Sequence, residues 1–283
     1  MQLRSPEEFR ASILKIKKLY STPQVLSKAL QLVNQPDVNL DPLADLINFD
    51  PALAADLIRI SNSALFSRGQ RFRDVQSAIQ WLGVKEVLRI ISLSLSKNMF
   101  GKGLINYGLS AQEYWNASVL AALTMETLAK KHKIDHQEAH MVGILHAIGR
   151  VLINEALEEI GWSLFWDNSI PVDLWELENV GFTHAGAGAL LLREWKFPQS
   201  IYSPIEQQLA AVTGAPADSI GGMMRFTSFL LYRRDFATLA AGAVATVPLE
   251  MLAWAGFESD EELSEFLSGI QKKLEHVVAS LNT

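Results

Sequence analysis

Proline-initiated helix starts recur near the beginning of this chain, and they limit what it can fold into. At each of them, a residue with a side-chain oxygen stands directly before a proline. The oxygen can accept a hydrogen bond from a free N–H of the first helical turn, and proline lacks an N–H that the first helical position does not need. The three pairs are Thr22-Pro23, Asp41-Pro42 and Asp50-Pro51. They predict a series of short helices.

Capping boxes and terminal glycines extend this pattern along the chain. In a capping box, the side chain of the cap and a glutamate three residues later each bond a free N–H at the helix start. The boxes begin at Ser5, Ser110, Asp135 and Ser259, and glycines that predict helix ends are Gly83, Gly149 and Gly256. No stretch alternates apolar and polar residues between hairpin turns. The sequence therefore predicts an all-α protein with an N-terminal bundle of short helices over residues 1–105 and a larger helical domain over residues 106–283.

Composition excludes several classes of function. The chain has no cysteine and a net charge of -6 at pH 7. It therefore has no disulfide or thiolate zinc site, and its overall charge repels nucleic acid. The N-terminus lacks the apolar region of a secretory signal, and the apolar stretch from Phe236 to Phe257 is interrupted by Pro248 and Glu250. We expect a cytoplasmic protein that binds neither nucleic acid nor a membrane.

Several separated motifs, spread over about residues 18–208, occur in an order that carries more information than any one of them. They are Thr22-Pro23-Gln24-Val25, Asp50-Pro51-Ala52-Leu53, Asn62-Ser63-Ala64, Gln76-Ser77-Ala78-Ile79 and Gly143-Ile144-Leu145-His146-Ala147-Ile148-Gly149. Together they resemble the HDOD domain family, which is related to HD-type phosphohydrolases. The resemblance implies a bacterial, all-helical signalling or regulatory domain with an HD-like fold, usually without hydrolase activity.

The same resemblance indicates where the metal ligands of an HD-type hydrolase would stand. Such enzymes hold a divalent metal with a histidine, an adjacent His-Asp pair and a later aspartate. This chain has Asn116 at the first position, His146-Ala147 at the pair and Ser228 near the last. Alanine offers no ligand atom, and the amide oxygen of asparagine is neutral and weaker than a carboxylate. The resemblance therefore implies that the chain is not an enzyme and holds no metal and no cofactor.

Five residues are candidates for binding a ligand in a remnant of the ancestral cleft. His184 matches a histidine that the family retains, and Arg150 follows His146 by about one helical turn, where it can bind an anion in bidentate fashion. Asn116 and Glu178 complete the set. The alternative is that both histidines are buried and hydrogen-bonded between packed helices.

A second set of histidines imitates a zinc site without predicting one. His132, His136 and His140 are four residues apart, but Asp135 begins a new helix between them, so we expect a solvated helix face.

From these observations we expect a non-catalytic regulatory module that acts through contacts with other signalling proteins, with a small-molecule ligand in the remnant cleft as an option. The alternative is a residual metal-dependent phosphohydrolase that acts on nucleotides or cyclic dinucleotides.

Overall fold

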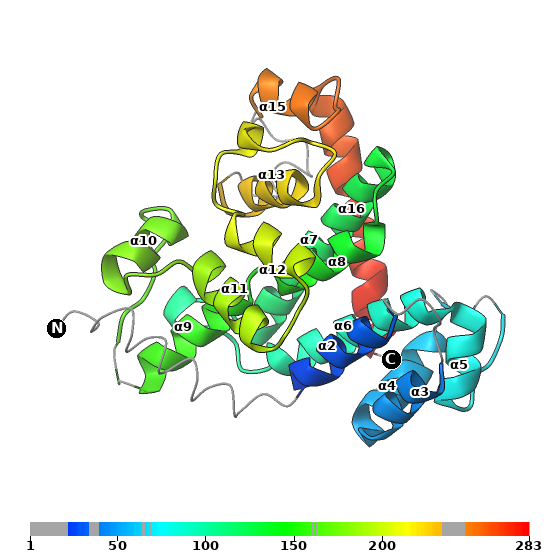
Figure 1. Ribbon diagram of the computed structural model, residues 1–283. Coiled ribbons are helices and arrows are strands. Elements are labelled where there is room, and N and C mark those ends of the chain that lie inside the picture. The colour runs from blue at the N-terminus through cyan, green and yellow to red at the C-terminus, as the bar shows by residue number, and fades with distance from the viewer. Residues whose placement is uncertain are drawn as a thin grey trace. The chain divides into compact units, whose positions relative to one another are not determined.

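The computed structural model describes residues 22–33, 40–63, 66, 67, 69–159, 161, 163–233 and 247–282. Within these ranges the chain forms helices and no strand, and one isolated β-bridge joins Leu104 and Leu109 (Figure 1). The predicted all-α fold is confirmed. The helix start expected at Ser5 and residues 236–246 of the apolar stretch lie outside the described residues. No helix in the described part has both the length and the hydropathy needed to cross a membrane.

The smaller of two compact units contains the described residues from 22 to 101 and from 275 to 282. Its helix α6 packs against α2, α4 and α5, and α3 contacts α2, α4 and α5. Fully buried apolar side chains such as Leu43, Leu57 and Ile90 form its core. The helices are α2 (Thr22–Val33), α3 (Asp41–Asn48), α4 (Pro51–Ser61), α5 (Val75–Leu82) and α6 (Val84–Met99).

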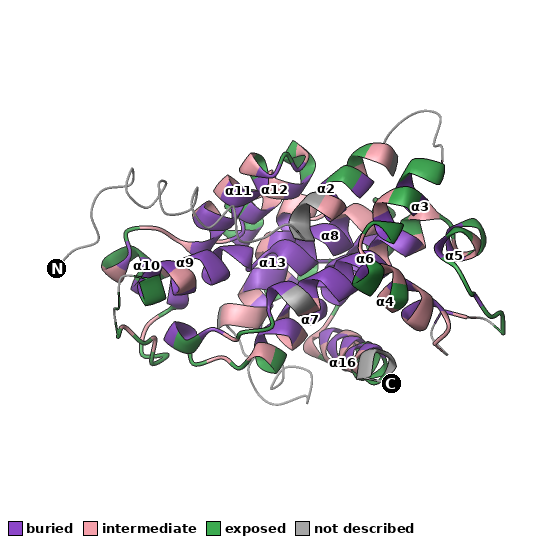
Figure 2. Ribbon diagram, turned by 90° about the horizontal axis from the view of Figure 1, so that it is seen from below, coloured by how far each residue is buried: buried purple, intermediate pink, exposed green. Residues whose placement is uncertain are grey.

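The larger unit contains the described residues from 102 to 274. Its centre is the pair α7 and α8, with α9 packed on α11 and with α12 and α13 in contact with α8; α8, α9 and α13 are largely buried (Figure 2). The expected boundary between residues 105 and 106 stays a prediction. The elements are η1 (Ile105–Tyr107), α7 (Ala111–His132), α8 (His136–Leu145), α9 (Ile148–Glu159), α10 (Val172–Asn179), α11 (His184–Glu194), α12 (Gln199–Glu206), η2 (Val212–Gly214), α13 (Ile220–Arg233), α15 (Leu249–Trp254) and α16 (Asp260–Asn282), whose last residues belong to the smaller unit.

Most of the predicted helix starts are confirmed. Asp50 accepts hydrogen bonds from the N–H groups of Ala52 and Leu53, Ser110 and Glu113 form the full capping box, and Asp135 caps α8. One start differs by one residue. Helix α3 begins at Asp41 itself and its cap position is Leu40, so Asp41 is not the cap; Asp41 instead accepts a hydrogen bond from Gln76.

Two of the three predicted glycine stops are confirmed, and the third is wrong. Gly83 and Gly256 end α5 and α15 with φ angles of 78° and 77°. Gly149 lies instead in the first turn of α9. A Cβ atom added there would lie 1.9 Å from the carbonyl oxygen of His184 and 2.6 Å from the backbone nitrogen of Gly188. Glycine is needed at this position because the backbones of α9 and α11 meet there.

Replacing Asp50 by alanine tests the helix start of α4. We expect Asp50→Ala to lower the free energy of unfolding by about 0.5–2 kcal/mol, because two N–H groups of the first turn lose their acceptor. Urea denaturation measures the loss. Asp50→Asn keeps an acceptor oxygen and should restore most of the stability, whereas equal stability of wild type and Asp50→Ala would show that the cap contributes nothing.

Candidate functional site

A buried carboxylate in α10 organises the centre of the candidate site. Glu176 is fully buried, and the Tyr107 hydroxyl donates to its Oε1 at 2.9 Å. The backbone N–H of His184 donates to its Oε2 at 2.7 Å, and His184 Nδ1 lies 2.8 Å from the same oxygen. Burial alone would raise the pKa of Glu176, but His184 and Arg150 favour the carboxylate and lower that pKa below its usual value. The carboxylate therefore holds the Nδ1 edge of the His184 ring.

His146 is the C-cap residue that directly follows α8, and it is fully buried. Its Nδ1 lies 2.7 Å from the carbonyl oxygen of Gly143, which can only accept, so Nδ1 carries the ring proton. Nε2 is then an acceptor, and it receives a hydrogen bond from the hydroxyl of Tyr232. Burial lowers the pKa of His146 to about 3, so the ring is neutral at physiological pH. Both ring nitrogens are engaged by the protein.

Arg150 lies in the first turn of α9 and is only 4% exposed. Its guanidinium carbon lies 4.2 Å from the centre of the Tyr232 ring and 5.4 Å from the centre of the Tyr107 ring. Such contacts with aromatic faces stabilise a buried cation. Its Nε and Nη2 are buried without a hydrogen-bond partner in the described part of the chain, and the same holds for Nε2 of His184.

Tyr232, from α13, joins these groups. Its ring stacks on His146 with a centroid distance of 5.6 Å and meets the edge of His184 at 5.7 Å. We call His146, Arg150, Glu176, His184 and Tyr232 the buried cluster. Three of the five residues predicted from the sequence, namely His146, Arg150 and His184, therefore surround one tyrosine.

The other two predicted candidates lie elsewhere. Asn116 is half-buried on α7 and accepts a hydrogen bond from Gln112, one turn earlier. Glu178 is exposed on α10, and the carboxylate that reaches His184 belongs to Glu176 instead. Little in the sequence indicates this choice, because α10 exposes Leu174 and Leu177 while it buries a glutamate. That arrangement reverses the usual apolar pattern of a helix.

The remaining positions of the family's metal pattern belong to internal hydrogen bonds. Ala147 is buried, and its carbonyl oxygen accepts from the Tyr114 hydroxyl at 2.6 Å. Ser228 donates to Gln208 at 3.0 Å, and Gln208 donates to the carbonyl oxygen of His146 at 2.8 Å. Among the described residues, no group of three or more histidine, aspartate or glutamate side chains is arranged to hold a metal ion.

A cavity of about 370 Å³ lies next to the buried cluster. Gln208, Ser228, Arg225 and Tyr232 contribute to its wall. Arg225 is held there by bonds from Nη1 to the Ala211 carbonyl oxygen and from Nη2 to the Gln207 side chain. One tyrosine thus borders the cavity and also covers His146 and Arg150.

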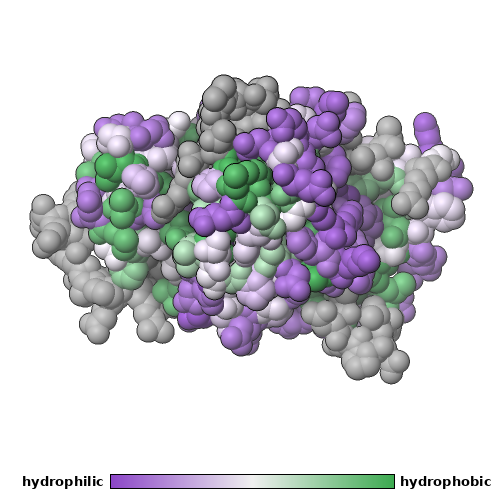
Figure 3. All heavy atoms as spheres, turned by 90° about the horizontal axis from the view of Figure 1, so that it is seen from above, coloured by the Kyte–Doolittle hydropathy of each residue, from purple (hydrophilic) through white to green (hydrophobic). Residues whose placement is uncertain are grey.

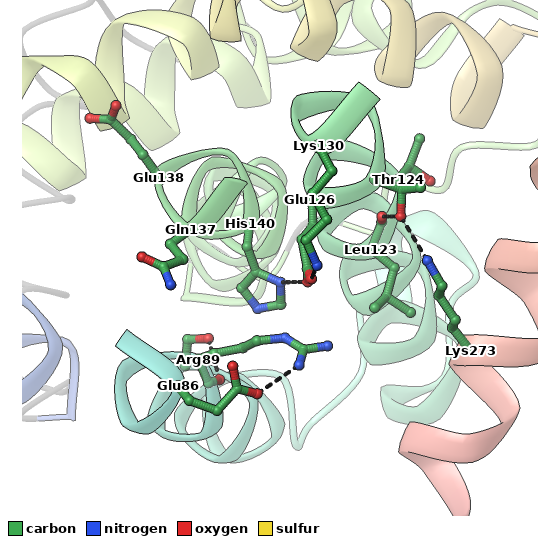
Figure 4. A network of polar contacts seen from close by, with 12 residues as sticks. Glu86, Arg89, Leu123, Thr124, Glu126, Lys130, Gln137, Glu138, His140 and Lys273 are labelled. Carbon is green, nitrogen blue, oxygen red and sulfur yellow. Dashed lines mark hydrogen bonds and ion pairs between the residues drawn. The ribbon is translucent and has the colours of Figure 1, made fainter. Parts of the chain in front are cut away.

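One histidine of the second set, His140, packs between α7 and α8. As predicted, α7 ends at His132 and α8 begins at His136, so no continuous helix carries the three rings. His140 is not on a solvated face as expected: it is 2% exposed, with Nδ1 3.3 Å from Oε2 of Glu126 (Figure 4). Lys130 bonds the other oxygen of the same carboxylate.

A comparison with family models identifies one family. A family model of the HDOD domain matches residues 19–211. An uncharacterised protein of Treponema pallidum (strain Nichols) is 26% identical over 191 residues, which cover 65% of this chain and 36% of that protein. The chain therefore spans little more than a third of the length of this relative.

Solved structures share the fold at low sequence identity. A candidate phosphohydrolase of Shewanella amazonensis SB2B has a TM-score of 0.67 at 21% identity, with 96% of this chain and 98% of that chain covered. An HDOD domain protein of Geobacter sulfurreducens has a TM-score of 0.64 at 19% identity, with 98% and 97% covered. A candidate signal transduction protein of Marinobacter aquaeolei VT8 has a TM-score of 0.69 at 19% identity, with 95% and 60% covered. These similarities confirm the predicted HD-like fold.

Proposed function

Because this chain belongs to the HDOD domain family, we propose that it is a non-catalytic regulatory module of the bacterial cytoplasm that acts through contacts with other signalling proteins. The alternative, a residual phosphohydrolase acting on nucleotides or cyclic dinucleotides, needs a metal site.

The observation that carries the proposal is that both ring nitrogens of His146 already make hydrogen bonds within the protein. In an HD-type hydrolase, the histidine of the His-Asp pair binds the metal. Here Nδ1 faces the carbonyl oxygen of Gly143 and Nε2 accepts a hydrogen bond from Tyr232. A metal would have to displace Tyr232, and it would then find Ala147 where the aspartate of the pair stands in the enzymes. A single neutral imidazole is a weak site for a divalent ion, and it does not orient an attacking water.

Exposed apolar side chains support a role in protein contacts. Ile105 in η1 and Phe165 are 61% and 57% exposed. Two hydrogen bonds join their segments. The carbonyl oxygen of Asn106 accepts from the N–H of Trp166, and the side-chain amide of Asn106 donates to the carbonyl oxygen of Leu164. Apolar residues also reach the surface at several places on the face that Figure 3 shows. Exposed apolar groups of this kind are typical of surfaces that bind other proteins.

Metal content and turnover test the proposal. We expect purified protein to hold no stoichiometric divalent metal and to hydrolyse phosphomonoesters, phosphodiesters and cyclic dinucleotides no faster than the buffer, with manganese or magnesium supplied. Elemental analysis and a turnover assay measure both. The matched control is His146→Ala/His184→Ala, which should behave as the wild type does. Stoichiometric metal, together with turnover that this double variant loses, would establish the hydrolase instead.

Protein contacts need a separate measurement. Cross-linking in the source cells, followed by capture of the tagged chain, should recover a defined partner. A heat-denatured sample of the same chain is the control, and equal recovery of all proteins by both samples would contradict a specific contact.

A further inference from the structure

Arg150 is a buried cation whose hydrogen-bonding capacity the protein leaves partly unused. Buried charged groups are normally paired with an opposite charge and fully hydrogen-bonded. Here Nε and Nη2 have no acceptor in the described part of the chain. The nearest carboxylate of the buried cluster, Glu176, already accepts from Tyr107 and from the backbone and ring of His184. The protein supplies aromatic faces to Arg150 instead.

The two unpartnered nitrogens of Arg150 have a specific geometry. Nε and Nη2 lie on the same edge of the planar guanidinium, so their N–H bonds run nearly parallel. Such an edge matches two oxygen atoms of a carboxylate or a phosphate group in a bidentate pair. The Nε2 atom of His184 is likewise buried and without a partner, and the same Tyr232 ring covers both residues.

Tyr232 belongs both to the buried cluster and to the wall of the cavity of about 370 Å³. Its ring contacts Arg150 and His184 on the cluster side, and it is also part of the cavity wall together with Gln208 and Ser228. Its hydroxyl is bonded to His146. Rotation of this side chain away from the cluster would open a path from the cavity toward Arg150 and His184.

We propose that the buried cluster binds the oxyanion group of a small molecule through Nε and Nη2 of Arg150. In this proposal the Tyr232 side chain blocks access to the site from the cavity. The inference rests on the proposed function, in which the cleft holds no metal, and it names the chemistry of the ligand. Glu176 contributes a fixed negative charge beside the site.

Replacing Tyr232 by alanine, which removes the blocking side chain, tests the proposal. Binding to a site that is open for only a fraction of the time is weakened by that fraction. Tyr232→Ala should therefore bind a small oxyanion at least tenfold more tightly than the wild type. The probes are acetate and inorganic phosphate at constant ionic strength, with chloride as the reference, and titration calorimetry measures the affinity. Tighter binding of acetate alone identifies a carboxylate ligand, and tighter binding of phosphate alone identifies a phosphate group; either result supports the site.

A second readout assigns the binding to Arg150. The NMR signal of its side-chain Nε–H, identified by its loss in Arg150→Met, should shift on titration of Tyr232→Ala. The double variant Tyr232→Ala/Arg150→Met should bind no better than the wild type. Equal affinity of Tyr232→Ala and the wild type, equal affinity of the single and double variants, or an equal response to chloride would each overturn the proposal.

Tyr232→Phe keeps the ring and removes only the hydrogen bond to His146. It serves as a second variant in case Tyr232→Ala does not fold. It should bind the oxyanion more tightly than the wild type does, by a smaller factor than Tyr232→Ala. Unchanged affinity would contradict the proposal that Tyr232 blocks access to the site. Turnover assays on the same variants keep the two proposals apart. Anion binding without turnover supports both of them, whereas absent binding together with absent turnover rejects only the anion site.

Discussion

Glu176→Ala is expected to lower the free energy of unfolding by about 3–5 kcal/mol, which is the usual effect of removing one partner from a buried ionic pair. The variant leaves the Tyr107 hydroxyl and the backbone and ring N–H groups of His184 without their acceptor in a buried site. It also removes the negative charge that favours the charged form of Arg150. Few surface interactions in a protein of this size have a comparable effect, because water replaces a lost partner there.

The matched control for this variant is Glu178→Ala. Glu178 is on the same helix, two residues away, and it is exposed. Its removal should change the free energy of unfolding by no more than about 0.5 kcal/mol. Urea denaturation of the two variants, followed by circular dichroism, measures the difference. Similar stabilities would mean that the Glu176 carboxylate does not hold α10 to α11.

The pH dependence of stability is a second test of how much the Glu176 carboxylate stabilises the fold. The folded state lowers the pKa of this carboxyl below its usual value of 4.5. The carboxylate therefore stabilises the fold above that value, and the contribution is lost as the pH falls through the lowered pKa. Glu176→Gln has no such group, so the stability difference between wild type and Glu176→Gln should shrink on acidification below about pH 4.5.

Gly149→Ala is expected to cost about 3 kcal/mol or more, or to prevent folding. The added methyl group would lie 1.9 Å from the carbonyl oxygen of His184 and 2.6 Å from the backbone nitrogen of Gly188. Backbone atoms cannot rotate out of the way as a side chain does, so α9 and α11 would have to separate. The buried apolar surface between them would then be partly lost.

Gly186→Ala, on α11, is the control for the glycine prediction. An added Cβ atom there would lie 3.6 Å from the Thr183 hydroxyl oxygen, which is an ordinary contact. Alanine has a higher helix propensity than glycine, so this variant should be neutral or more stable by up to about 1 kcal/mol. Thermal unfolding of both variants provides the comparison. If Gly149→Ala were as stable as Gly186→Ala, the close approach of α9 and α11 would be wrong.

The all-α class, most of the helix caps and the family of the chain could be predicted from the sequence without a structure. The caps at Asp50, Ser110 and Asp135 depend on a side chain and an N–H group two or three residues away, so each is a local interaction that can be read directly. The order of the motifs likewise needed no structure, and the family match over residues 19–211 confirmed it.

The construction of the candidate site, by contrast, depends on contacts between helices that are far apart along the chain. His146, Arg150 and His184 were identified from a motif, but their common partner Tyr232 lies on α13, far away in the sequence and outside every motif. Glu176 and Glu178 are two residues apart on one helix, and which of them is buried depends on how α10 is rotated against its neighbours. Gly149 fitted the pattern of a helix end, although its role depends on the backbone of α11. Each of these features arises from contacts between segments that are distant along the chain, and local patterns carry no information about such contacts.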